Sequence, residues 1–163
     1  MAREANKAID DVAELIRHEH RLLAEKLGQL RDVCACAAQK RDCAACDRAQ
    51  VARCELEVAK VLEEVFVYMV EHFRTEESVI RDHRLDILDR ACCEGHREAH
   101  AEITEQARKL IAGLTPTTVI PRLNELVGLM QGWLGGHIAS HDHRLLGLLG
   151  AEREQIARLV SPP

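Results

Sequence analysis

Five of the nine histidines lie where the helical repeat of apolar residues requires a buried side chain. A carboxylate accompanies them, because Glu76 follows one of these histidines by a single helical turn and shares its face. Burying such polar groups without partners would cost about 1–3 kcal/mol for each group. A metal ion removes that cost, since neutral imidazoles and carboxylates are common metal ligands. The pattern therefore favours a buried metal site over separately satisfied core histidines, with candidate ligands His20, His72, Glu76, His96, His100 and His137.

Amphipathic helices are expected to position these residues, because apolar side chains recur along the chain at steps of three and four. Aromatic residues make up only 2% of the chain, and abundant alanine, leucine, glutamate and arginine favour helix. We predict an all-α, up-down-up-down four-helix bundle. Its helices are expected over residues 9–30, 58–80, 91–111 and from about 121, with a short C-terminal tail helix over residues 151–160.

The spacing of the candidate ligands along the chain predicts where the turns lie. Ligands of one site must lie at one level of a bundle, so each turn should fall midway between successive ligand positions. These midpoints fall at residues 46, 86 and about 118, all within segments whose composition already predicts a turn. The candidate ligands are therefore consistent with a single level.

Length and charge limit the other functional classes. A chain of 163 residues suits one core, so we expect a single domain, with a cysteine-rich connection over residues 33–55 and a tail over residues 150–163. Lys and Arg number 22 against 27 Asp and Glu, and no basic stripe follows the sequence, which argues against nucleic-acid binding. Because neither a leader nor a long apolar segment is evident, we expect a cytoplasmic protein that does not bind membranes.

Three sequence motifs resemble those of the bacterial hemerythrin-like family, also described as HHE cation-binding, and the resemblance extends over roughly residues 15–145. His72-Phe-Arg-Thr-Glu76-Glu77 is similar to H-F-x-x-E-E, and His96-Arg-Glu-Ala-His100 is similar to H-x-x-x-H. Trp133-Leu-Gly-Gly-His137-Ile-Ala-Ser-His-Asp142 is similar to W-L-x-x-H-I-x-x-x-D. The combination is far more specific than any one of the three motifs.

The resemblance implies a non-haem di-iron protein that binds dioxygen, or a related small ligand, reversibly. His96, His100 and His137 would then bind one iron, and His20 and His72 the other. Glu76 and Asp142 would bridge the two ions. The first iron would be coordinatively full, whereas the second would keep an open position for dioxygen.

The chain departs from the family pattern in its aromatic residues, and these departures leave other functions open. An aromatic residue usual after H-x-x-x-H is Ile103 here, and a tyrosine usual after the final aspartate is Leu145. One alternative is a di-iron enzyme that reduces peroxide or nitric oxide, or oxidises iron. Another is a redox or oxygen signalling module that acts through the cysteine-rich connection. The same ligands also accept zinc or manganese.

Asp142 presents a conflict between geometry and resemblance. In a regular helix, His141 at i+4 shares the face of His137, whereas Asp142 at i+5 is turned roughly 140° away. Asp142 can reach the metals only if the helix ends or bulges there. We favour Asp142 on the resemblance and keep His141 as the alternative.

Five of the seven cysteines gather near the predicted first turn, as Cys34-Ala-Cys36, Cys43-Ala-Ala-Cys46 and Cys54. Cys34, Cys36, Cys43 and Cys46 could surround one tetrahedral zinc ion. A redox-active dithiol and simple packing are the competing interpretations.

This cysteine-rich connection, on the order of 30–40 Å from the ligand level, is expected to be too far away for its cysteines to bind the irons. It could contact a protein partner or a second copy of the chain. Cys92 and Cys93 are expected to pack in the core.

Overall fold

The computed structural model describes residues 2–33, 46–115 and 119–160, and all regular structure within these ranges is helical. This confirms the predicted all-α class. The helices are α1 (Ala2–Asp32), α3 (Arg48–Asp82), α4 (Leu85–Leu88), α5 (Arg90–Ala112), α6 (Val119–His137), the π-helix η2 (Ile138–Asp142) and α7 (His143–Val160).

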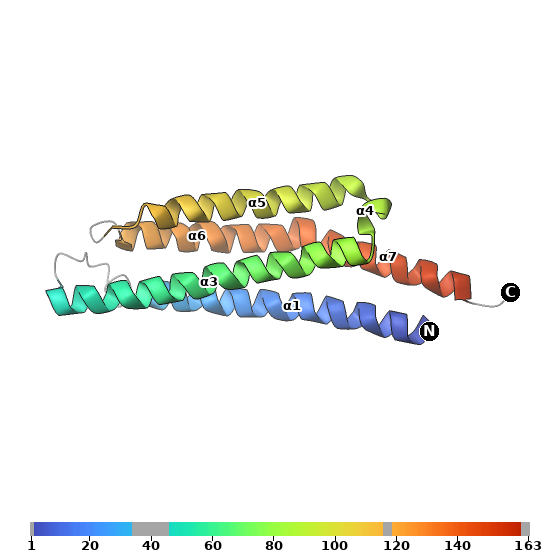
Figure 1. The fold of residues 1–163 in the computed structure, drawn as a ribbon, viewed down its shortest axis with the longest axis horizontal. Coiled ribbons are helices and arrows are strands. Elements are labelled where there is room, and N and C mark those ends of the chain that lie inside the picture. The colour runs from blue at the N-terminus through green and yellow to red at the C-terminus, as the bar shows by residue number, and fades with distance from the viewer. Residues whose placement is uncertain (1, 34–45, 116–118, 161–163) are drawn as a thin grey trace.

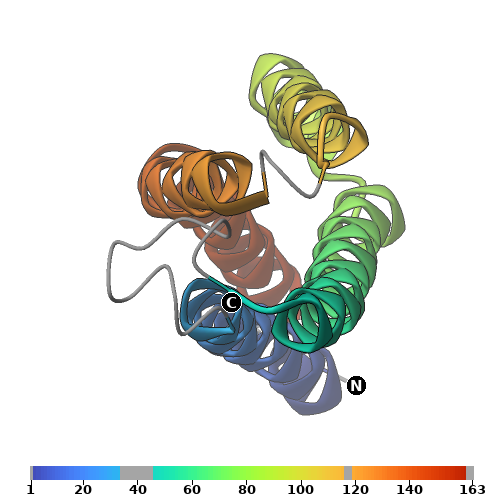
Figure 2. The same ribbon diagram turned by 90° about the vertical axis from the view of Figure 1, so that its left-hand side faces the viewer.

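The four long helices α1, α3, α5 and α6 lie lengthwise beside one another, and Figure 1 shows α7 continuing beyond α6. In the end-on view of Figure 2 these helices surround a common axis. The start of α1 and the end of α3 lie at the same end of the molecule, as does the short helix α4. The fold is therefore a helical bundle whose elements could direct side chains to a shared interior.

Aspartate caps set the starts of α3 and α5. Asp47 accepts a hydrogen bond from the backbone N–H of Gln50 at 2.7 Å, and Asp89 accepts one from Cys92 at 2.9 Å. Such caps satisfy backbone donors that a helix N-terminus leaves unpaired. The helix expected from residue 58 therefore begins ten residues earlier, at Arg48, whereas α5 lies within one residue of its expected bounds.

The buried interior has a polar layer between two apolar clusters. On α1, His20 lies between Ile16 of the smaller cluster and Leu23 of the larger one. The same order holds on α3 and on α5, and along the continuous run of α6, η2 and α7. The buried polar residues of this layer are His72, Glu76, His96, His100, His137 and Asp142. The layer matches the single level that the spacing of the candidate ligands predicts.

The C-terminal part of the chain differs from expectation. No separate tail helix begins near residue 151, because α7 runs without a break from His143 to Val160. Leu145 and Leu149 of α7 are buried in the smaller cluster together with Ile9 and Ile16 of α1. Packing against α1 therefore gives this helix a buried face well before the charged segment that suggested a tail.

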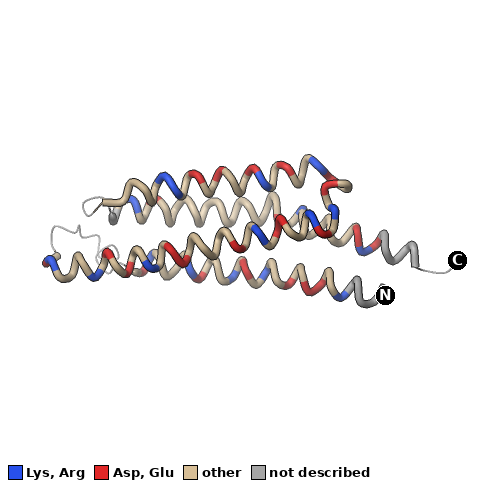
Figure 3. Tube along the Cα trace, viewed as in Figure 1, with Lys and Arg blue, Asp and Glu red and all other residues tan. Residues whose placement is uncertain are grey.

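Charged residues lie mainly on α1, α3 and α5, where Figure 3 shows acidic and basic positions interspersed along the trace. Much of α6 carries no charge. Along the described part of the trace, Lys and Arg alternate with Asp and Glu and form no long basic run (Figure 3). None of the described helices combines the length and the apolar character that a transmembrane span requires.

Candidate metal centre

The seven residues predicted to bind metal form two groups that share Glu76. One group contains Glu76, His96, His100 and His137, and the other contains His20, His72, Glu76 and Asp142. Within each group, one candidate ligand atom from every residue lies within 4.8 Å of all the others. The structure therefore brings all seven predicted residues together from four helices and η2.

Each helix contributes side chains to this centre through ordinary helical spacing. On α3, His72 and Glu76 are one turn apart, and on α5, His96 and His100 are one turn apart. Residues at i and i+4 share a face of a helix, so each pair projects into the same interior layer. His20 enters from α1, and His137 is the last residue of α6.

The π-helix η2 explains how Asp142 reaches the centre. Its backbone bonds join residues five apart, which places Asp142 on the same face as His137. Oδ1 of Asp142 lies 3.0 Å from Nε2 of His137, and its Oδ2 atom lies 2.9 Å from Nε2 of His20. His141 belongs to neither group and is half-buried, with its ring stacked on that of His137 at 4.9 Å. The structure thus brings Asp142, and not His141, into the groups.

Glu76 lies at the middle of the centre and is completely buried. Its Oε2 atom lies 3.0 Å from Nε2 of His96, 3.2 Å from Nε2 of His100 and 3.6 Å from Nε2 of His72. Its Oε1 atom lies 3.8 Å from Nε2 of His20. One carboxylate therefore faces imidazoles of both groups.

The histidine nitrogens face one another in a way that hydrogen bonding alone does not satisfy. Nε2 of His137 lies 3.1 Å from Nε2 of His100 and 3.3 Å from Nε2 of His96. A contact between two imidazole nitrogens uses one proton, so three converging nitrogens leave lone pairs directed at one another. Several further atoms are buried without a hydrogen bond to any described residue: Nε2 of His20 and of His72, Oε1 of Glu76, and both carboxylate oxygens of Asp142. These donors fit divalent transition-metal ions.

The mutual contacts also determine the charge of this layer in the metal-free protein. Burial would raise the pKa of Glu76, but its contacts with His100, His20 and His96 hold that pKa well below its usual value. Burial lowers the pKa of His20, yet the nearby carboxylates of Asp142 and Glu76 outweigh burial and raise it to about 9. The carboxylate is therefore ready to bind a cation, whereas His20 must first lose a proton.

Aromatic rings enclose one side of the centre. Phe73 stacks on His100, with ring centroids 3.8 Å apart, and Trp133 stacks on His137 at 4.4 Å. Ile103 and Leu145, at the two positions where the resemblance led us to expect aromatic residues, are both buried. The centre therefore keeps an apolar boundary, although two of its side chains differ in shape from those expected.

Two carboxylates near the centre were not predicted as functional residues. Oε2 of Glu19 lies 3.0 Å from Nδ1 of His72, and Oε1 of Glu77 lies 3.2 Å from Nδ1 of His100. Glu77 is the last residue of the motif His72-Phe-Arg-Thr-Glu76-Glu77, so the sequence did indicate that it could lie near the ligands. Glu19 contacts a residue 53 positions away, and only its place beside His20 hinted at a role.

The cysteine prediction lies mostly outside the described residues, which do not include Cys34, Cys36 or Cys43. Cys46 and Cys54 are half-buried, and the Gln50 amide donates to Sγ of Cys54 at 3.2 Å. Neither metal group among the described residues contains a cysteine. Cys92 and Cys93 are buried, and Cys93 packs in the smaller apolar cluster, as expected for a core role.

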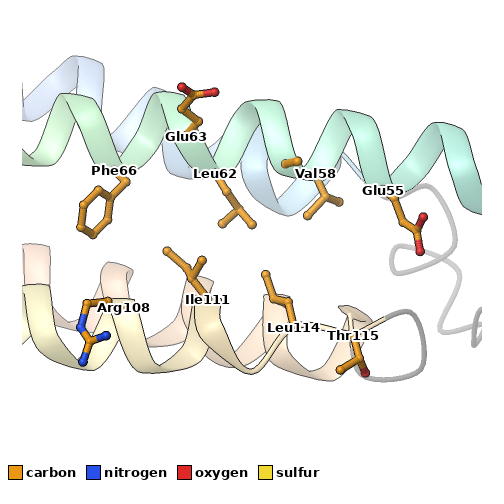
Figure 4. Close-up of a pocket in the computed structure, with 10 residues that line it drawn as sticks. Glu55, Val58, Leu62, Glu63, Phe66, Arg108, Ile111, Leu114 and Thr115 are labelled. Carbon is orange, nitrogen blue, oxygen red and sulfur yellow. The ribbon is translucent and has the colours of Figure 1, made fainter.

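A separate cavity of about 570 Å³ lies between α3 and α5 and is shown in Figure 4. Val58, Leu62 and Phe66 point into it from α3, opposite Ile111 and Leu114. None of the candidate metal ligands lines this cavity. This cavity is therefore separate from the candidate metal centre.

Comparison with known protein families identifies the family of this fold and ligand set. The family model described as Hemerythrin HHE cation binding domain matches residues 11–149, which include both groups of candidate ligands. The corresponding searches of curated proteins and of solved structures returned no match.

Proposed function

Because this chain belongs to the hemerythrin HHE cation-binding domain family, we propose that it is a non-haem di-iron protein that binds dioxygen reversibly. The observation that carries the proposal is the pair of buried ligand groups joined by Glu76. The alternating course of the four helices in Figure 1 supports an up-down-up-down bundle as the scaffold. The family match over most of the chain supports a single domain.

We assign one iron to His96, His100 and His137, and the other to His20 and His72. Glu76 and Asp142 would be shared by both ions. This assignment is supported by the contacts of Asp142, whose two carboxylate oxygens face His137 and His20 separately. With both carboxylates shared, the His20 and His72 position has one protein donor fewer than the other. An open position for a small ligand is therefore expected there.

The irons, when bound, would supply the electrons that dioxygen needs in order to bind. The residues of the polar layer would hold both ions, and the two apolar clusters lie on either side of that layer. Phe73 and Trp133 cover the imidazoles of His100 and His137, and this cover limits the access of water. Exclusion of water protects a reversible adduct from side reactions.

A di-iron enzyme that reduces peroxide or nitric oxide, or oxidises iron, is the second candidate. It is favoured by the partial exposure of His20, whose side chain is 11% exposed, because this is the side from which reactants would approach the open position. A signalling role, or a zinc or redox site formed by Cys34, Cys36, Cys43 and Cys46, remains a proposal. It concerns a segment that lies mainly outside the described residues.

Visible spectroscopy of iron-loaded protein tests the choice between these functions. We expect a spectrum that appears when the anaerobically loaded protein meets air, disappears on deoxygenation and returns in a second cycle. Rapid oxidation that deoxygenation does not reverse, together with turnover of added peroxide, would support the enzyme instead.

A further inference from the structure

Glu19 contacts the metal-binding layer from α1, although it belongs to neither ligand group. Its Oε2 atom lies 3.0 Å from Nδ1 of His72, and its Oε1 atom lies 2.9 Å from the hydroxyl of Thr75. The Glu19 side chain is only 14% exposed, and the His72 side chain is fully buried. This hydrogen bond between α1 and α3 is therefore shielded from solvent.

The Glu19 carboxylate determines which nitrogen of His72 carries the proton. An ionised carboxylate only accepts hydrogen bonds, so Nδ1 of His72 must be the donor. Nε2 of His72 then keeps its lone pair, and this buried atom is the one that faces Glu76. A carboxylate that accepts from the far nitrogen also makes a coordinating imidazole more basic.

The other ligand group lacks an equally shielded contact. The Nδ1 atoms of His96 and His137 are buried and form no hydrogen bond with any described residue. Nδ1 of His100 lies 3.2 Å from Glu77, but the Glu77 side chain is 41% exposed. Because water weakens exposed polar contacts, the contact with Glu19 should have the larger effect. The two metal positions are therefore unequal beyond their immediate ligands.

We propose that Glu19 is a positioning residue for the metal position formed by His20, His72, Glu76 and Asp142. Glu19 keeps the proton of His72 on Nδ1 and makes Nε2 a stronger metal ligand. The hydrogen bond from the Thr75 hydroxyl holds the Glu19 carboxylate in place. Loss of such a contact to a ligating histidine typically lowers metal affinity by about 10-fold to 100-fold. The inference rests on the proposed function for the identity of the metal, but any divalent transition-metal ion would require the same donor.

Competition titrations of full-length protein with Zn²⁺ and a chromophoric chelator test this proposal. Glu25 is exposed on the same helix, so Glu25→Gln is the matched control for Glu19→Gln. We expect the control to bind two ions as the unchanged protein does. Glu19→Gln should bind one ion normally and the other about tenfold more weakly. Glu19→Asp should restore part of that affinity.

Thr75→Val removes the hydrogen bond to Glu19 without changing a charge. It also provides a second test of the proposal if Glu19→Gln fails to fold. It should weaken the same ion by a smaller factor, and combining it with Glu19→Gln should cause little further loss. In protein loaded with iron, Glu19→Gln should have a higher reduction potential than Glu25→Gln, because the carboxylate stabilises the more highly charged oxidised ions.

Unchanged affinity in Glu19→Gln, or equal weakening of both ions, would overturn the proposal. A lower thermal stability without selective loss of one ion would indicate a structural role and would overturn it too. Failure of the proposed function gives a different pattern, because the selective Zn²⁺ effect would persist while the iron-loaded protein showed no reversible spectrum in air.

Discussion

His137 and Asp142 are five residues apart in sequence, yet Nε2 of the histidine lies 3.0 Å from Oδ1 of the aspartate. The contact depends on η2, because an ordinary helix would turn Asp142 away from His137. A π-helix turn is rare and often lies at a functional site. The backbone of this segment therefore shapes the candidate metal centre.

Replacing Asp142 should disrupt metal binding, whereas replacing His141 should not. Asp142 faces both ligand groups through its two oxygens, while His141 lies outside them. We expect Asp142→Ala to reduce bound metal from about two ions per chain to about one or fewer, since each metal position loses a donor. Metal analysis of the purified variants measures this. Equal losses in Asp142→Ala and His141→Ala would contradict the assignment.

Deleting Ala139 should convert η2 into ordinary α-helix without moving the residues that follow. Ala139 is exposed, and its removal would place the aspartate four residues after His137, the spacing at which α-helix neighbours share a face. We expect this deletion variant to fold and to retain both metals, with thermal stability equal to or above that of the parent chain. Inserting an alanine after Ala139 provides the contrast, because it turns the aspartate by about 100°. Retention of metal by the insertion variant would contradict this account.

The stability of the metal-free protein should fall as pH rises from about 6.5 to about 9. The folded-state pKa of His20 is about 9, above its ordinary value of 6.5, so protonation of His20 favours the folded state. This contribution is fully present below pH 6.5 and is lost as the pH rises through about 9. The lowered pKa values of Glu76 and Asp142 place their titration on the acidic side, outside this window.

Urea denaturation in the presence of a chelator, repeated at several pH values, measures this dependence. His20→Gln should flatten it, because glutamine does not titrate. His18 is exposed on the same helix, so His18→Gln serves as the control and should keep the slope. If the free energy of unfolding of His20→Gln depends on pH as steeply as that of the unchanged protein, a group other than His20 causes the dependence.

Replacing Arg84 with glycine should stabilise the protein. Arg84 has a φ of 51°, in the left-handed region, where a side chain costs roughly 1–2 kcal/mol. Glycine removes that cost but increases the entropy of the unfolded chain, so we expect a net gain of up to about 1 kcal/mol. The free energy of unfolding measures the gain, with Arg84→Ala as the control that should show none. An equal gain from alanine would show that the backbone is not its source.

Regular spacing allowed much of the centre to be predicted from sequence. His96 and His100 lie one helical turn apart, and the midpoints between ligands all fall between the ends of successive long helices, because both depend only on helical geometry. The reach of Asp142 required a π-helix, for which the local sequence gave no independent signal. Glu19 was missed because its contact with His72 joins two helices, and such pairing depends on how the bundle packs. The start of α3 was missed although Asp47 is a typical capping residue.

The iron content of the protein tests the central claim most directly. Glu76 is completely buried and belongs to both ligand groups, so a shared centre should depend on it. After anaerobic loading with Fe²⁺ and removal of excess metal, we expect about two irons per chain in the unchanged protein and fewer than one in Glu76→Ala, because both positions lose a ligand. About one iron or less in the unchanged protein, or two irons retained in Glu76→Ala, would contradict a di-iron centre that shares Glu76.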